Sequence, residues 1–404
     1  MSPSELSPLL TELLHLTPRL VEVRHRLHAH PEPAWAETET TALLLGELEA
    51  AGYDCRVGPT GTGLIADLVT AEGAPFVAHR ADIDALPLSD LSEDPRVPRS
   101  TIPGVMHACG HDVHTAVGLG AALVFASHRE RLRHNLRFIF EPAEEVAPGG
   151  AIEMVRHGAM TGVRAITALH VDPQIELGRV GLRPGALTAA VDSFELVIRG
   201  RGGHSARPHL AVDPILLGTR VVSELYSTLP RMMDARDPFV ITVGRFHAGS
   251  APNVIPDVAE VAGTCRSFDL VMRARALELV RTLASAVVEP AGGALEMRVQ
   301  QGSPPILNDP RLCAAAEAVV GATLGPEAVV AIDRASMGGE DFSEYLTQAP
   351  GLFFRLGTRT DGPVHQLHSS HFVADDRAIT IGAKVVVALL AKLDRTAADS
   401  GTPL

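Results

Sequence analysis

The chain has 404 residues, of which 46% are hydrophobic and 21% charged, and its 35 Lys and Arg against 48 Asp and Glu give a formal net charge of −13. The apolar fraction excludes a disordered chain. The acidic balance argues against binding to nucleic acid or to an anionic membrane surface. The length suits two or three domains. The 18 histidines stand out, because histidine binds metals and transfers protons, although most surface histidines do neither.

The cysteines and the N-terminus bear on the compartment. The four cysteines lie far apart and form no CxxC pair, so we do not expect a disulfide scaffold. The segment MSPSELSPLLTELLHL lacks the basic start of a secretory signal, and the apolar run at 117–126 is too short and glycine-broken to span a bilayer. We therefore expect a cytoplasmic protein.

The first 180 residues alternate helix-like and strand-like segments. The expected elements are, in order, helices at 9–30 and 38–51, a strand at 75–79, a helix at 113–131, and strands at 136–140 and 164–171. Gly52 ends the second helix. Strands separated by helices predict an α/β domain with a largely parallel sheet.

The pattern changes near residues 181–185. There follow a strand at 189–199, a helix at 211–229, strands at 239–247 and 258–267, a helix at 271–290 and a strand at 295–301. This βαββαβ order is that of the ferredoxin-like unit. A linker follows at 302–305, and mixed segments then resume, including a strand at 352–356. We predict an α/β domain at 1–184 and 302–404, interrupted by an α+β domain at 185–301.

Polar residues cluster directly after the predicted strands of the α/β domain. Asp82 and Asp84 follow the first strand, Glu144 and Glu145 follow the second, and His170 lies near the end of the third. Because open α/β sheets build their sites at the carboxyl ends of strands, we expect these side chains to converge. Taken singly, the acids are also ordinary loop caps or first-turn residues, and His170 an ordinary hydrogen-bonded core residue.

Residues 107–114, HACGHDVH, place three histidines, a cysteine and an aspartate before an Ala/Gly-rich helix. A helix N-terminus favours thiolate, so we expect a lowered pKa for Cys109. Cys109 and His111 are good ligands for zinc or a related divalent ion. One alternative is a buried cysteine among structural histidines. Another is a cysteine nucleophile with a histidine base, which leaves the carboxylates and His170 unexplained.

Taken together, these segments resemble the M20 metallopeptidase family in order along essentially the whole chain. They are most similar to its amidohydrolase branch, which contains aminoacylases, hippurate hydrolases and indole-acetyl-amino-acid hydrolases. The matching segments are HAHPE (28–32) with Glu37 and Thr40 at matching spacing, RADIDALPL (80–88), GVMHACGHDVHTA (104–116), EPAEE (141–145), ALHV (168–171), GRGGHSARPH (200–209), APNVIPD (251–257), GGEDF (338–342) and LHSSHF (367–372).

The resemblance implies a zinc-peptidase-like α/β catalytic domain with a two-metal site, and an insert that serves as a dimerisation or lid domain. The implied ligands are Cys109 as bridging thiolate, His111, Glu145, His170 and His368. The other implied residues are Glu144 as general base, Asp84 as the carboxylate that orients a ligand, His204 as the histidine that reaches the site, typically that of the partner subunit, and Asn253 and Arg266 as substrate-binding residues. The Cys/His set favours zinc, with manganese, cobalt and nickel as alternatives.

The sequence departs from the family pattern at three positions. Asp82 stands where wider M20 members have a histidine, and we expect His111 to compensate. Ser370 replaces a proline, so the ligand loop is expected to be less rigid and His371 to compete with His368. Glu141 replaces a glutamine, and an extra carboxylate raises local pKa values or shifts substrate choice. Besides His371, the histidines at 107 and 114 are expected to lie next to the ligands.

We therefore expect metal-dependent hydrolysis of N-acyl amino acids to a carboxylic acid and a free amino acid, carried out by a homodimer on a small-molecule substrate. A dipeptidase or carboxypeptidase of the same fold is the first alternative, although its usual ligand patterns have Asp in place of Cys109. An inactive metal-binding or transport-type module is the second, and the intact Glu144 and full ligand set argue against it.

Overall fold

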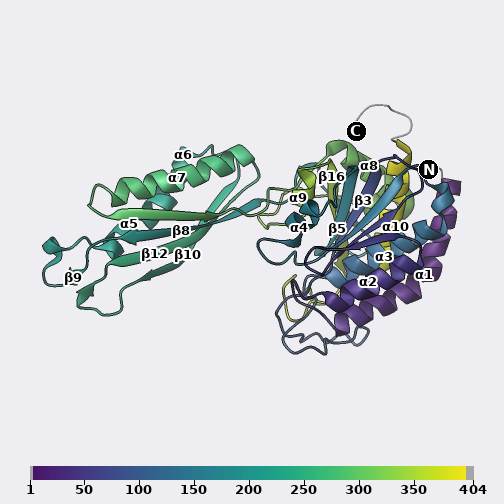
Figure 1. Ribbon diagram of the computed structural model, residues 1–404, viewed down its shortest axis with the longest axis horizontal. Helices are drawn as coiled ribbons and strands as arrows, with labels where there is room; N and C mark the ends of the chain where they lie inside the picture. The colour runs from purple at the N-terminus through teal and green to yellow at the C-terminus, as the bar shows by residue number, and fades with distance from the viewer. Residues whose placement is uncertain (1–2, 397–404) are drawn as a thin grey trace. The chain divides into compact units, whose positions relative to one another are not determined.

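The computed structural model describes residues 3–396 and divides into two compact units (Figure 1). The α/β unit takes in the chain up to Leu187, Leu307–Arg334 and the chain from Asp341 onward. The insert comprises Thr188–Ile306 and Ala335–Glu340. Its main segment begins and ends a few residues later than the expected 185–301. The sequence analysis did not anticipate that 335–340 return to the insert.

An eight-stranded sheet forms the centre of the α/β unit, in the order β1-β2-β4-β3-β5-β16-β6-β15. Its strands are β1 (Asp54–Val57), β2 (Leu64–Leu68), β3 (Phe76–Asp82), β4 (Asn135–Glu141), β5 (Val163–Glu176), β6 (Val180–Leu182), β15 (Val329–Ala331) and β16 (Gly351–Arg359). Strands β4, β3, β5 and β16 are parallel neighbours, whereas β2 and β6 flank them in antiparallel pairs. The next two strands along the chain, β4 and β5, lie on opposite sides of β3, so the strand order reverses there. Ligands bind at such a reversal in open α/β sheets.

Helices cover this sheet, and most of them share its apolar core. They are α1 (Pro3–Ala29), α2 (Thr38–Ala50), α3 (His111–Ser127), α4 (Gly150–Arg156), α8 (Pro310–Leu324), α9 (Ser343–Leu346) and α10 (Arg377–Thr396). Helix α3 lies against β3 and β5 and packs on α1 and α10. Its small residues permit this burial, since a Cβ on Gly120 would come within 2.5 Å of Leu20 on α1. Among residues 3–396, no helix combines the length and apolar character needed to cross a membrane.

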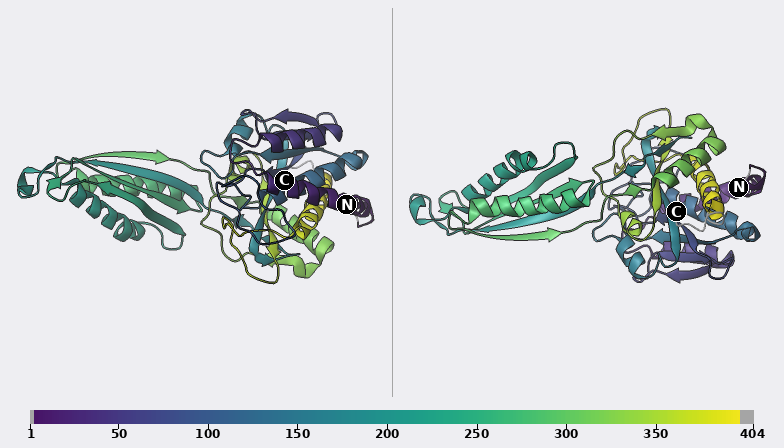
Figure 2. Two further views of the ribbon diagram at one scale, coloured as in Figure 1. Left: turned by 90° about the horizontal axis from the view of Figure 1, so that it is seen from below. Right: turned by 90° about the horizontal axis from the view of Figure 1, so that it is seen from above.

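The insert is a four-stranded antiparallel sheet with two long helices on one face (Figure 2). The sheet order is β10-β12-β8-β13, formed by β8 (Ala190–Arg199), β10 (Phe239–Ala248), β12 (Val258–Ser267) and β13 (Ala294–Gln300). Its helices are α5 (Pro214–Ser227), the short α6 (Leu229–Met232) and α7 (Leu270–Val288). Asp213 and Asp269 cap α5 and α7 by accepting from backbone N–H groups. The order βαββαβ confirms the ferredoxin-like unit predicted for the insert, and the α/β fold predicted for the chain is confirmed with it.

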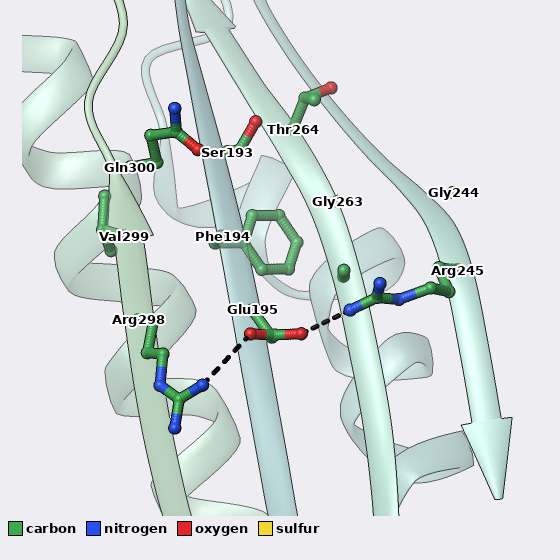
Figure 3. A pocket seen from close by; sticks show the side chains of 11 residues that line it. Ser193, Phe194, Glu195, Gly244, Arg245, Gly263, Thr264, Arg298, Val299 and Gln300 are labelled. Carbon is green, nitrogen blue, oxygen red and sulfur yellow. Dashed lines mark hydrogen bonds and ion pairs between the residues drawn. The ribbon is translucent and has the colours of Figure 1, made fainter. Parts of the chain in front are cut away.

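The other face of the insert sheet is polar (Figure 3). Glu195 accepts a hydrogen bond from Arg245 and lies 3.7 Å from Arg298. Exposed ion pairs of this kind contribute only about 0–1 kcal/mol each. The residues forming them come from three of the four strands, β8, β10 and β13, so the ion pairs reach across the sheet but add little to its stability.

Candidate metal and active site

The predicted site residues lie on or after four neighbouring strands and at the start of α3. Asp82 and Asp84 lie at and just beyond the end of β3, and His170 lies within β5. Glu144 and Glu145 follow β4, His368 follows β16, and Cys109 and His111 lie at the start of α3. The convergence expected from the strand order is therefore present within one unit.

The five predicted metal ligands lie together in two groups. Cys109 Sγ is 3.3 Å from His170 Nε2 and 3.3 Å from His368 Nε2. His368 Nε2 is 3.1 Å from Glu145 Oε1, which is 3.9 Å from His111 Nε2. One group joins Cys109 to His111 and His170, and the other joins it to Glu145 and His368. Cys109 is thus common to both groups.

The donor atoms fit divalent metal ions. Zinc–ligand bonds measure about 2.0–2.3 Å, so donors around one ion stand roughly 3–4 Å apart. The four distances given above, 3.1–3.9 Å, lie in this range. His111 Nε2 is buried and makes no hydrogen bond to any described residue. A buried nitrogen left in this way costs free energy unless something else binds it. Thiolate, imidazole and carboxylate are the ligands of zinc and its neighbours.

Neighbouring groups orient these ligands. Asp84 Oδ1 lies 3.0 Å from His111 Nδ1, and its Oδ2 accepts a 3.0 Å hydrogen bond from Glu145 N. His170 Nδ1 lies 2.7 Å from the Val171 carbonyl. Each contact places the hydrogen on Nδ1 and leaves the Nε2 lone pair facing the cluster. The orienting role predicted for Asp84 therefore has the contacts it requires.

His114 lies beside the ligands, as expected, and connects α3 to β5. Its Nδ1 hydrogen-bonds Asp82 and its Nε2 accepts from Val171 N at 2.9 Å. Burial lowers the pKa of His114, which keeps the ring neutral and able to accept. His107 differs, because both of its ring nitrogens are buried without a hydrogen bond to the described residues.

Glu141, one of the departures from the family pattern, joins a buried ion cluster. Arg80 donates to Glu141 at 2.6 Å, to Asp82 at 2.5 Å and to Asp341 at 3.1 Å. Burial and the charge of Glu141 raise the pKa of Asp341 well above its usual range. The sequence analysis did not select Arg80 or Asp341. An arginine in a strand of otherwise buried residues was the available signal, since arginine is rarely buried unless paired.

The second departure, at Ser370 and His371, leaves the predicted ligand in place. His368 adopts a left-handed φ of 63°, and its N–H donates to the Ala108 carbonyl at 2.9 Å. His371 is exposed, stacks on His365 with ring centroids 5.4 Å apart, and belongs to neither donor group. The Ser370 carbonyl accepts from Leu91 N at 2.7 Å, so the loop is anchored without a proline.

One expectation for Cys109 is wrong. The helix N-terminus was expected to lower its pKa, but burial raises the pKa of this thiol well above its ordinary value. The carboxylates of Glu145 and Glu144 raise it further, against the opposing effect of His111. Loss of solvation exceeds the helix effect here. Without a cation beside it, the thiol stays protonated.

The residues predicted from the insert lie at two places within it. His204 in β9 (Gly203–His204) pairs with β11 (Val254–Ile255), which directly follows Asn253, so these two candidates are close together. Arg266 donates to the Met337 carbonyl at 2.6 Å. Its guanidinium therefore supports the 335–340 segment. The roles predicted for all three residues remain predictions.

Comparison with known proteins agrees with this geometry. The sequence matches peptidase family M20/M25/M40 over residues 78–392. The chain belongs to this family. An N-acetylcysteine deacetylase of Bacillus subtilis is 38% identical over 368 residues, covering 91% of this chain and 94% of that protein. Thermostable carboxypeptidase 2 of Saccharolobus solfataricus is 33% identical over 369 residues, covering 90% and 92%.

A solved structure shares the fold. The YXEP protein of Bacillus subtilis, described as a dinuclear metal-binding peptidase from the M20 family, superposes with a TM-score of 0.82 at 33% identity, covering 95% of this chain and 99% of that one. Family, fold and relatives together make the chain a metal-dependent amidohydrolase.

Proposed function

We propose that this enzyme hydrolyses the amide bond of N-acyl amino acids, releasing a carboxylic acid and a free amino acid. The observation that carries the proposal is the pair of donor groups sharing Cys109, with Glu144 Oε2 4.0 Å from His111 Nε2. The deacetylase relative supports an N-acyl substrate. The proposed cofactors are two divalent ions, zinc before manganese, cobalt or nickel, held by Cys109, His111, Glu145, His170 and His368.

The chain's own residues divide the chemistry between them. Bound divalent ions polarise the amide carbonyl and lower the pKa of a water molecule. Glu144 takes the proton of the attacking water and returns it to the departing nitrogen. For this step, Asp84 holds His111 and the Glu145 backbone in place, and Glu145 holds His368. His368 has a side chain that is 54% exposed, so the cluster opens toward solvent on its side, where a substrate enters.

His204 is proposed to donate a hydrogen bond to the oxyanion. Its Nδ1 accepts from Ala206 N at 3.0 Å, so the neutral ring carries its hydrogen on Nε2. An oxyanion donor of this kind is typically worth about 3–4 kcal/mol. Asn253, next to it through the β9–β11 pair, and Arg266 are the proposed contacts for polar groups of the substrate.

We propose a homodimer joined through the insert, in which His204 serves the partner's site. The chain enters the insert at Thr188, just before β8, and His204 comes just after the other end of β8. The ten residues of β8 span about 33 Å. We also propose the cytoplasm as the compartment, since none of the four thiols, all within the described residues, forms a disulfide.

The test is a turnover screen of the metal-loaded enzyme. N-acetyl, benzoyl and indoleacetyl amino acids are compared with dipeptides and carboxypeptidase substrates. Hydrolysis of the N-acyl series with little peptide cleavage is expected, and the reverse preference contradicts the proposal. Glu144→Gln should keep its metal and lose about 10²–10⁴-fold in kcat, because it removes the proton acceptor without removing a ligand. Turnover close to that of the wild type would exclude Glu144 as the base.

A further inference from the structure

Glu37 is a fully buried carboxylate to which the proposed mechanism gives no role. Its side chain is 0% exposed. Oε1 accepts a 2.8 Å hydrogen bond from Ala143 N, which lies 106 positions later in the chain. Oε2 is buried and makes no hydrogen bond within residues 3–396. Burying an incompletely paired carboxylate is costly, so its presence needs a reason.

Helix capping does not supply that reason. Glu37 occupies the N-cap position of α2, but its side chain makes no capping hydrogen bond. The carboxylate of Glu32 does this instead, accepting from Glu39 N at 3.0 Å and from Thr40 N at 2.8 Å. Because another acid already binds the first turn of α2, the Glu37 carboxylate is available for a contact outside the helix.

The contact that it makes is with an unusual residue. Ala143 has a φ of +55°, in the left-handed region that L side chains other than Asn and Asp rarely adopt. Its N–H is held by Glu37, and its carbonyl accepts from Gly150 N at 3.1 Å. Gly150 has no room for a side chain, since a Cβ there would lie 1.8 Å from the Pro142 carbonyl oxygen.

Ala143 directly precedes Glu144 and is followed two positions later by Glu145. A return of Ala143 to an ordinary φ would rotate the chain that carries both. We propose that Glu37 is a positioning residue for the general base: it holds Ala143 in the left-handed conformation that directs Glu144 toward the metal site. This inference rests on the proposed function and adds Glu37 to the residues on which the turnover of the enzyme depends.

The main experiment compares Glu37→Ala with Glu37→Gln. The alanine variant loses the acceptor for Ala143 N and should lose at least about tenfold in kcat, with KM within threefold and metal content unchanged. The glutamine variant keeps a carbonyl oxygen at the same place and should recover most of that kcat. A general packing defect would lower stability in both variants without this separation.

A second substitution tests the conformation itself. Glycine adopts positive φ without strain, so adding Ala143→Gly to Glu37→Ala should restore part of the lost kcat. Leu48→Ala is the matched control. Leu48 is also fully buried on α2 but belongs to the apolar core, so its loss should lower the unfolding temperature and leave kcat unchanged. If Glu37→Ala does not fold, Glu37→Asp replaces it, because the shorter side chain does not reach Ala143 N.

Hydrogen exchange provides a readout that does not depend on the substrate. Amides of residues 142–150 should exchange faster in Glu37→Ala than in the wild type and in Glu37→Gln. Unchanged exchange in this segment, or a loss of kcat that neither glutamine nor Ala143→Gly restores, overturns the proposal. A wild-type enzyme that is inactive on every N-acyl substrate contradicts the proposed function instead, and hydrogen exchange still decides the contact between Glu37 and Ala143.

Discussion

Cys109 is the one donor that both groups of the site share. Its sulfur lies between His170 and His368 at 3.3 Å from each, so replacing it removes a ligand from both groups at once. We predict that Cys109→Ala binds clearly less than the wild-type amount of metal after reconstitution. Elemental analysis measures this, with Cys313→Ala as a buried-thiol control on α8. Two ions per chain in Cys109→Ala would refute the ligand role.

Glu37 also predicts a pH dependence of stability. Burial, with the nearby charge of Asp84, raises the pKa of this carboxyl from 4.5 to about 7. The folded protein therefore holds a proton between these two values that the unfolded chain has released. The stability contributed by the protonated group is fully present below pH 4.5 and is lost as pH rises through 7.

Glu37→Gln does not titrate and isolates this effect. Relative to the variant, the wild type should lose up to roughly 3 kcal/mol in free energy of unfolding between pH 4.5 and 8. Denaturant unfolding of both proteins at several pH values measures the difference, in which other titrating groups cancel. A difference that stays constant across this range would show that Glu37 ionises in the fold as readily as in the unfolded chain.

At the scale of elements, His114 connects α3 to the strand that carries His170. It accepts from Val171 N, while the Val171 carbonyl holds His170 Nδ1. We predict that His114→Ala weakens metal binding by about 10–100-fold, as the loss of an orienting contact typically does. His114→Gln keeps an acceptor near the position of Nε2 and should weaken binding less. Competition with a chromophoric chelator measures both, and an unchanged affinity in the alanine variant would contradict this role.

The sequence predicted most long elements, because their periodicity is set locally. The strands that became β8, β10 and β12 were expected within one residue of their observed bounds. The short β6 and β15 were missed, since three residues carry too little pattern, and β1 and β2 were missed as well. Contacts between distant segments were also out of reach. No spacing rule links Glu37 to Ala143, and the burial that raises the pKa of Cys109 exists only in the packed fold.

At the scale of the whole molecule, the insert carries more than half of the exposed large apolar side chains in the described part of the chain. Ile215, Leu216 and Tyr226 lie along α5 with side chains 38%, 49% and 48% exposed. Apolar surface of this kind marks a site for association. If the proposed dimer forms through this surface, Leu216→Glu combined with Tyr226→Glu should shift it to monomer. Light scattering after size exclusion measures the mass, and a dimer that persists would place the interface elsewhere.

If the dimer exchanges His204 between subunits, two inactive variants should complement each other. A His204→Ala chain keeps Glu144 but lacks the oxyanion donor, whereas a Glu144→Gln chain keeps His204 but lacks the base. In a mixed dimer, the site of the first chain receives His204 from the second and becomes active, so remixed subunits should regain up to half of the wild-type kcat per mixed dimer. A histidine acting within its own chain leaves every site incomplete, and the mixture would then be no more active than its components.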